Sequence, residues 1–279
     1  MRWHLVLLFI LLFPHSVHGA FEFLDVGARP AAMGGAFCAV ADDAHALHYN
    51  AAGMGQLQGR RASVSTCQYF GLAGPSMHNI SLLQSASWGV LGLEVQRFGQ
   101  DLYRETALGL SFGRSLLEAL SLGISLRGLQ LAISGYGSAQ TFGLDLGFLA
   151  AMTPRFRWGV WVYNLNNGRL GRSRQEMPQV FIMGFAYRPD SKLLLSADLL
   201  LDIADCSVEK LARGAYPVEL RLGQESRLWN PVALRLGLQT RPTRFSAGLG
   251  LEAGHLSLDY AYRSHQFLGG THYVSLSWP

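Results

Sequence analysis

Charge and cysteine are both scarce in this sequence. Only 15% of its 279 residues are charged, and lysine occurs twice, at Lys192 and Lys210. The basic residues form no run that resembles a nucleic-acid patch, so no nucleic-acid partner is expected. The three cysteines, Cys38, Cys67 and Cys206, lack metal-ligand spacing. One disulfide or three isolated thiols both remain open.

Long apolar runs are missing after residue 19. No later window approaches the roughly 18 to 20 consecutive apolar residues of a transmembrane helix, although 49% of the chain is hydrophobic and its mean hydropathy is +0.16. Residues 1–19 combine Arg2 with an apolar run from Leu5 to Phe13, the pattern of a secretory signal peptide cleaved before Ala20. We therefore expect export by the Sec route, with the apolar residues spread over many half-apolar strands.

From residue 60 onward, one unit of about ten residues recurs, in which apolar side chains alternate with small or polar ones. Such alternation is typical of a strand with one apolar and one tolerant face. Fourteen units are predicted as strands: 61–70, 76–85, 87–97, 104–113, 119–132, 139–151, 155–164, 178–188, 191–201, 216–226, 231–240, 243–252, 254–263 and 271–278. An even count suits a bacterial barrel, so residues 60–279 are predicted to be an all-β, antiparallel transmembrane β-barrel of about 14 strands.

The connections and the second strand face support this prediction. Connections after even-numbered strands are mostly tight, as at Met152-Thr153-Pro154, and those after odd-numbered strands are often longer, as at 165–177; Arg241-Pro242 is a short exception. This parity puts the short turns in the periplasm. A soluble β-sandwich would carry many charges on its second face, which here is mostly Gly, Ser, Ala and Gln. Its few charges are expected to line the lumen and pair across strands: Glu94, Arg127, Asp145, Asp198, Arg221, Arg235, Glu252 and Asp259.

Residues 20–59 follow a different pattern, with alanines, a glycine pair and turn residues instead of alternation. We expect short helical or irregular pieces that fold back into the lumen as a plug. The residues expected to build this plug are Gly27, Ala28, Arg29, Gly34, Gly35, Asp42, Asp43 and Asn50.

The same segment resembles the start of PorV/PorQ proteins and their relatives in the FadL-like superfamily. The resemblance rests on Gly27-Ala28-Arg29, on 32–37 (Ala-Met-Gly-Gly-Ala-Phe), on 41–44 (Ala-Asp-Asp-Ala) and on 50–53 (Asn-Ala-Ala-Gly), where Ala51 replaces the usual proline. It implies a fourteen-stranded outer-membrane barrel behind a plug, and it covers the two ends of the chain better than the middle.

Two roles follow from this resemblance. The main expectation is a docking barrel of PorV/PorQ type, with type IX secretion components as partners. The alternative is a FadL-like transporter of small hydrophobic molecules. In both cases the chain is expected to be no enzyme, to need no cofactor and to contact outer-membrane lipid and lipopolysaccharide.

Three motifs could carry other chemistry. Ser111 lies in Gly-Leu-Ser-Phe-Gly, but strand alternation continues through it, so no catalytic residue is predicted. Asp42, Asp43, His45 and His48 could gather around a metal, yet the family pattern accounts for the aspartates, so no metal site is predicted. Arg169, Arg172 and Arg174 could contact lipopolysaccharide phosphates from an external loop or be ordinary solvated residues.

Overall fold

The computed structural model describes residues 20–71, 75–171, 175–203 and 218–278. The predicted signal peptide, Cys206, Arg172 and Arg174 lie outside these ranges. Within them, no helix combines the length and apolarity needed to cross a membrane.

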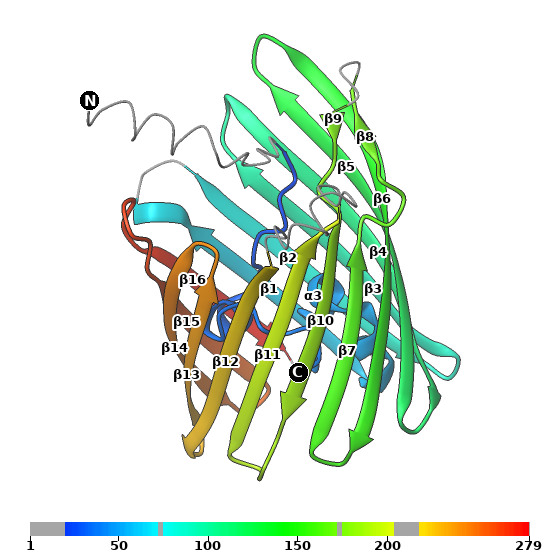
Figure 1. Ribbon diagram of the computed structural model, residues 1–279, viewed down its shortest axis with the longest axis vertical. Coiled ribbons are helices and arrows are strands. Elements are labelled where there is room, and N and C mark those ends of the chain that lie inside the picture. The colour runs from blue at the N-terminus through cyan, green and yellow to red at the C-terminus, as the bar shows by residue number, and fades with distance from the viewer. Residues whose placement is uncertain (1–19, 72–74, 172–174, 204–217, 279) are drawn as a thin grey trace, which may run out of the picture.

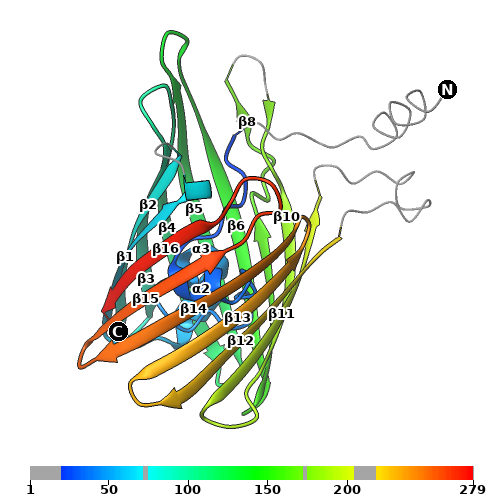
Figure 2. The same cartoon turned by 90° about the vertical axis from the view of Figure 1, so that its left-hand side faces the viewer.

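The strands form one closed antiparallel barrel of 14 strands, in the order β1-β16-β15-β14-β13-β12-β11-β10-β7-β6-β5-β4-β3-β2 (Figures 1 and 2). Closure between β1 and β16 leaves no unpaired edge, as a bilayer requires. The barrel strands are β1 (Arg60–Gln68), β2 (Ser76–Ala86), β3 (Gly89–Gly99), β4 (Tyr103–Leu117), β5 (Leu120–Ile133), β6 (Gly137–Thr153), β7 (Phe156–Tyr163), β10 (Val180–Tyr187), β11 (Leu193–Asp202), β12 (Val218–Trp229), β13 (Val232–Thr240), β14 (Thr243–Ala253), β15 (Leu256–Arg263) and β16 (Thr271–Trp278).

The predicted fold class is confirmed, and every predicted strand overlaps one barrel strand. The sequence did not predict a small hairpin of β8 (Arg169–Leu170) and β9 (Gln175–Glu176) inside the connection 165–177. Its strands are two residues long, too short for an alternating pattern to be recognised. Turns at one end of the barrel are short, and we name this the short-turn end; the opposite end is the long-connection end.

The two barrel faces differ as the alternation predicts. Large apolar side chains are exposed on the outside, for example Leu110, Leu126 and Leu236. Inward positions carry buried serines, asparagine and charged groups, such as Ser81, Asn79 and Arg127. An apolar exterior around a polar interior is the surface of a transmembrane barrel.

Residues 20–59, named the inner segment from here on, lie inside the barrel and are largely buried (Figures 1 and 2). The segment contains α2 (Ala28–Ala32), α3 (Ala46–Tyr49) and the 3₁₀ helix η1 (Ala51–Gln56); another 3₁₀ turn, η2 (Tyr69–Gly71), follows β1. α2 packs against β13 to β16, and η1 packs against β3 to β6. The inner segment therefore contacts both sides of the lumen wall.

Candidate functional site

A belt of glycines on the wall lets the inner segment approach closely. An added Cβ would collide with the inner segment at nine inward-facing glycines of β3 to β7, β10 and β12 to β14. At Gly223, for example, that atom would lie 2.6 Å from the carbonyl oxygen of Met33, and at Gly184 it would lie 2.9 Å from the amide nitrogen of Ala39. Backbone therefore packs on backbone here, which any larger residue would prevent. The glycine belt comprises Gly92, Gly113, Gly123, Gly147, Gly159, Gly184, Gly223, Gly237 and Gly248.

The first motif, Gly27-Ala28-Arg29, begins α2 at the lumen wall. Gly27 has a φ of 83° and packs directly on the His45 ring, so a side chain there would be strained and would collide. The Ala28 amide donates to Ser275 Oγ on β16 at 2.6 Å. Gly34 and Gly35 also have positive φ, and they carry the chain past the backbone of β12 and β13.

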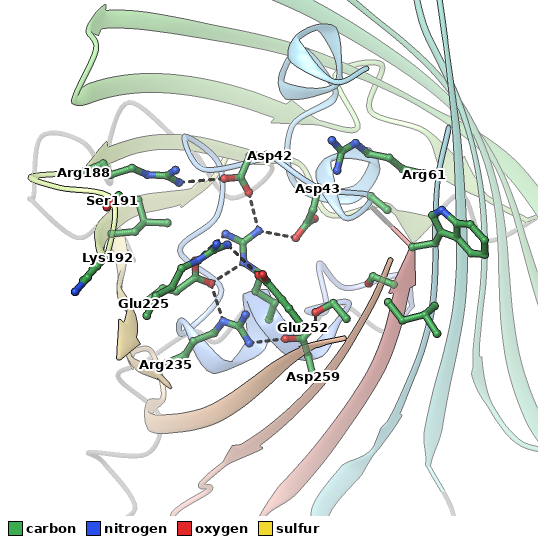
Figure 3. A pocket seen from close by; sticks show the side chains of 18 of the residues that line it. Asp42, Asp43, Arg61, Arg188, Ser191, Lys192, Glu225, Arg235, Glu252 and Asp259 are labelled. Carbon is green, nitrogen blue, oxygen red and sulfur yellow. Dashed lines mark hydrogen bonds and ion pairs between the residues drawn. The ribbon is translucent and has the colours of Figure 1, made fainter. Parts of the chain in front are cut away.

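Arg29 joins three carboxylates, those of Asp42, Asp43 and Glu225, which are labelled in Figure 3. Its guanidinium donates to Asp42 Oδ1 at 2.6 Å, to Asp43 Oδ2 at 2.7 Å and, through Nε, to Glu225 Oε2 on β12 at 2.7 Å. Asp42 also pairs with Arg188 at 3.2 Å. The structure thus brings three of the predicted plug residues together in one ionic cluster and ties them to the wall.

A second ionic cluster holds Asp25, which sequence reasoning missed. Its carboxylate accepts from Arg221 on β12 and from Arg263 on β15, and Tyr49 donates to it at 3.1 Å. Burial alone would raise the pKa of the Asp25 carboxyl, but the neighbouring Arg263 and Arg221 guanidiniums outweigh burial and hold that pKa well below its ordinary range. Asp25 is therefore a fixed anion between two strands of the wall.

Asn50 organises the other end of the inner segment. Its side-chain oxygen caps η1 by accepting from the Ala52 amide at 3.1 Å. Its Nδ2 donates to the carbonyl oxygens of Cys38 and of Phe148 on β6, at 3.1 Å and 3.0 Å. Alanine at position 51, where the PorV/PorQ resemblance leads one to expect proline, is compatible with this helix start.

Most of the predicted lumen charges are buried on the inner face. Arg127 pairs with Asp145 through two contacts of 2.7 Å and 2.8 Å, and Arg235 joins Glu225 to Asp259. Arg221 pairs with Asp25 and Glu219, and Glu94 accepts from Asn79 at 2.8 Å. Arg127 and Arg235 pair between strands, as expected, whereas Arg221 pairs with the inner segment and within β12. These partners explain how the charges tolerate burial.

Two members of that set behave differently. Asp198 accepts the amide hydrogens of Phe37 and Cys38 at 2.8 Å and 2.9 Å, so it anchors the inner segment's backbone. Glu252 is exposed at the short-turn rim, where it pairs with Arg227 at 3.1 Å. Glu252 occupies an inward position of the alternating strand β14, as predicted. It lies next to the turn at Gly254, however, so its side chain is at the rim and not in the enclosed lumen.

Two cavities lie on opposite sides of the inner segment. The lower cavity, at the short-turn end, has about 310 Å³ and is lined by charged residues including Arg29, Asp43 and Arg61 (Figure 3). The upper cavity, facing the long-connection end, has only about 20 Å³ and is lined by Phe21, His48, Arg127 and others. The inner segment therefore lies between the two cavities.

Phe21, near the start of the inner segment, lies in an apolar pocket on the side of the long-connection end. It is buried with Leu129 on β5, Leu170 on β8 and Met177, and Leu131 packs against this cluster. The small hairpin β8–β9 therefore contributes part of a pocket that holds one benzyl group.

The remaining candidate motifs make structural contacts. Ser111 lies in β4 and shares a hydrogen bond of 2.6 Å with Ser125, in place of a histidine. Among the described residues, no group of three or more His, Cys, Asp and Glu is placed to hold a metal. Cys38 and Cys67 are buried free thiols, and Arg169 is half exposed and pairs with Glu176 at 3.5 Å.

Comparisons with known proteins bear on the fold. No family model and no curated protein matches the sequence. Among solved structures, CymD, described as a monoaromatic hydrocarbon channel, matches with a TM-score of 0.67 at 15% identity, covering 93% of this chain and 98% of that one. The toluene transporter TbuX of Ralstonia pickettii matches at 0.66 with 13% identity, covering 92% and 98%. A FadL homologue of Pseudomonas aeruginosa matches at 0.65 with 13% identity, covering 92% and 99%. The chain has the fold of FadL-like barrels.

Proposed function

We propose that this protein is an outer-membrane channel that admits small hydrophobic molecules. The proposal is supported by the likeness to barrels described as hydrocarbon channels and toluene transporters. Those neighbours favour the transporter alternative over the secretion-docking role that the PorV/PorQ resemblance led us to expect. They are described as channels and transporters, which is compatible with a protein that is no enzyme. In this proposal the apolar exterior faces outer-membrane lipid, and the inner segment acts as the plug that closes the lumen.

The observation that carries the proposal is the Phe21 pocket. A benzyl side chain has the size and chemistry of a monoaromatic hydrocarbon, and here it is buried among Leu129, Leu170 and Met177. Burying such a ring stabilises the bound state by about 1.5–3 kcal/mol. A hydrophobic solute arriving from the long-connection end would compete with Phe21 for the same apolar surface, which couples binding to movement of the inner segment.

The test uses Phe21→Ala, with Phe267→Ala as a matched control. Phe267 lies at the same end of the barrel but is 86% exposed, outside any pocket. An apolar cavity left by a deleted ring stays dry and accepts aromatic ligands, so Phe21→Ala should raise the uptake of labelled toluene several-fold. Uptake is measured in cells with a lipopolysaccharide-containing outer membrane, against cells without the protein.

Phe267→Ala should take up toluene as the unaltered protein does. The proposal is wrong if the unaltered protein confers no uptake above the protein-free cells. It is also wrong if both variants change uptake equally, because the pocket would then have no special role.

A further inference from the structure

The strand register places one row of inward residues between the two cavities. Directly opposed positions run from Ser257 to Ser277, Ser63, Ser81, Glu94, Gly109 and Arg127, on seven neighbouring strands from β15 through β16 and β1 to β5. We name these seven residues the polar row. Six of them have polar side chains, and the glycine leaves Glu94 and Arg127 adjacent, since a Cβ at Gly109 would lie 3.6 Å from both.

The two ends of the polar row reach different cavities. Ser257 and Ser277 line the lower cavity, and Arg127 lines the upper cavity. Between them the row is closed in this structure, because Ser63 and Ser81 are buried beneath the inner segment.

The inner segment meets the row through hydrogen-bonding side chains. His45 Nε2 lies 3.3 Å from Ser63 Oγ, and Ser277 donates to the same oxygen at 3.0 Å. His48 Nδ1 lies 3.8 Å from Glu94 Oε1. These neutral or weakly paired contacts differ from the ionic clusters that Arg29 and Asp25 form with β12 and β15.

The wall at Ser63 and Ser81 lies outside the glycine belt, although an apolar cluster joins the inner segment to β1, β2, β15 and β16 at other positions. Strands β15, β16, β1 and β2 contain no glycine, so the glycine belt does not extend across them. Moving the inner segment away from the belt would lose close backbone packing and leave a void. Moving only His45 and His48 away from Ser63 and Glu94 exchanges polar protein contacts for hydrogen bonds to water, which changes the free energy much less.

We propose that the polar row is a path for water and small neutral polar solutes, of the size of urea, that fills when His45 and His48 move away from Ser63 and Glu94. This activity is distinct from the passage of hydrophobic molecules and does not depend on the Phe21 pocket. The hydroxyl, carboxylate and guanidinium groups of the row replace the hydrogen bonds that such a solute leaves behind in water.

The test probes hydration of the row in the full protein. In a background where Cys38, Cys67 and Cys206 are replaced by alanine, Ser63→Cys and Ser81→Cys are each treated with a small, water-soluble methanethiosulfonate reagent. Ser196→Cys is the matched control, because Ser196 is an equally buried, inward serine on β11, outside the row. Local opening exposes only the row, so its cysteines should react at least roughly tenfold faster than the control.

The same samples are then reconstituted in vesicles, and urea permeability is measured by stopped-flow light scattering. Modification of Ser63→Cys or Ser81→Cys should reduce urea permeability to the level of protein-free vesicles, and treatment of the control should leave it unchanged. Equal reaction rates at the three positions would overturn the proposal. So would urea permeability that does not exceed that of protein-free vesicles, or that is unaffected by complete modification of a row cysteine.

Discussion

Replacing Arg29 with leucine should detach the inner segment without unfolding the barrel. The Arg29 side chain is 12% exposed and contacts Asp42, Asp43 and Glu225 at 2.6 to 2.7 Å. Removing one partner from a buried ionic cluster costs about 3–5 kcal/mol, since it leaves charge without compensation. Each carboxylate keeps a second partner, namely Arg188, His45 and Arg235 respectively, so we expect the lower end of that range.

A cost of about 3 kcal/mol corresponds to a rise of roughly 100-fold in the population of the open segment. Limited proteolysis measures this population when cleavage is slow compared with reclosing. Cleavage within residues 20–59 should therefore accelerate by about that factor. The unheated variant should migrate on SDS gels as the unaltered folded barrel does.

The control is Arg169→Leu, which removes the pair with Glu176. Both side chains are about half exposed, at 49% and 51%, and the pair spans 3.5 Å. Such a pair contributes about 0–1 kcal/mol, so cleavage should change by no more than a few-fold. If Arg29→Leu and Arg169→Leu accelerate cleavage equally, the idea that the Arg29 cluster holds the inner segment is wrong.

Three further predictions concern the wall and its contacts with the inner segment. Gly237→Ala should destabilise the docked inner segment by about 1–3 kcal/mol through overpacking, because the new Cβ would lie 2.7 Å from the Ala32 carbonyl oxygen; Gly128→Ala, which faces open space on the outside, should be neutral in the same proteolysis assay. Leu236→Arg, at an outward position that is 57% exposed, should cost about 2–4 kcal/mol if it lies near the bilayer midplane, measured as the urea midpoint of folding into vesicles, and an unchanged midpoint would contradict the membrane assignment. Asp25→Asn should leave Arg221 and Arg263 without their shared anion and raise cleavage within residues 20–59, whereas Glu252→Gln at the rim should not.

The barrel was predictable because its determinants are local. Alternation over ten residues fixes which side chains face inward, and turn residues fix where each strand ends. Parity alone placed Glu94, Arg127, Asp145 and Asp259 on the inner face, where the structure has them. Parity says nothing about height along the barrel axis, which is why the exposed, rim position of Glu252 was not foreseen.

The contacts of the inner segment were not predictable in the same way. Asp25 meets Arg221 across 196 positions of sequence and Arg263 across 238, and no spacing rule connects such pairs. Arg263 did lie on the polar face of an alternating strand, so an inward arginine without an acidic neighbour on the next strand was the one available signal. The glycine belt was visible only as a high glycine content, since its function depends on the level at which the inner segment crosses each strand.

The wall is therefore divided into sectors that hold the inner segment by different forces. Where β4 to β7 and β12 to β14 present glycine, contact is close packing of backbone, which tolerates no added atom and no gap. Where β1 and β16 present Ser63 and Ser275, contact includes hydrogen bonds that water can replace, beside an apolar cluster that joins the inner segment to β1, β2, β15 and β16. Opening should therefore be local to the serine contacts and leave the packed sectors in place, because only polar contacts are exchanged for water there. If opening were uniform around the wall, cysteines placed at Ser63 and Ser196 would become reactive together, and this asymmetry would have no mechanical consequence.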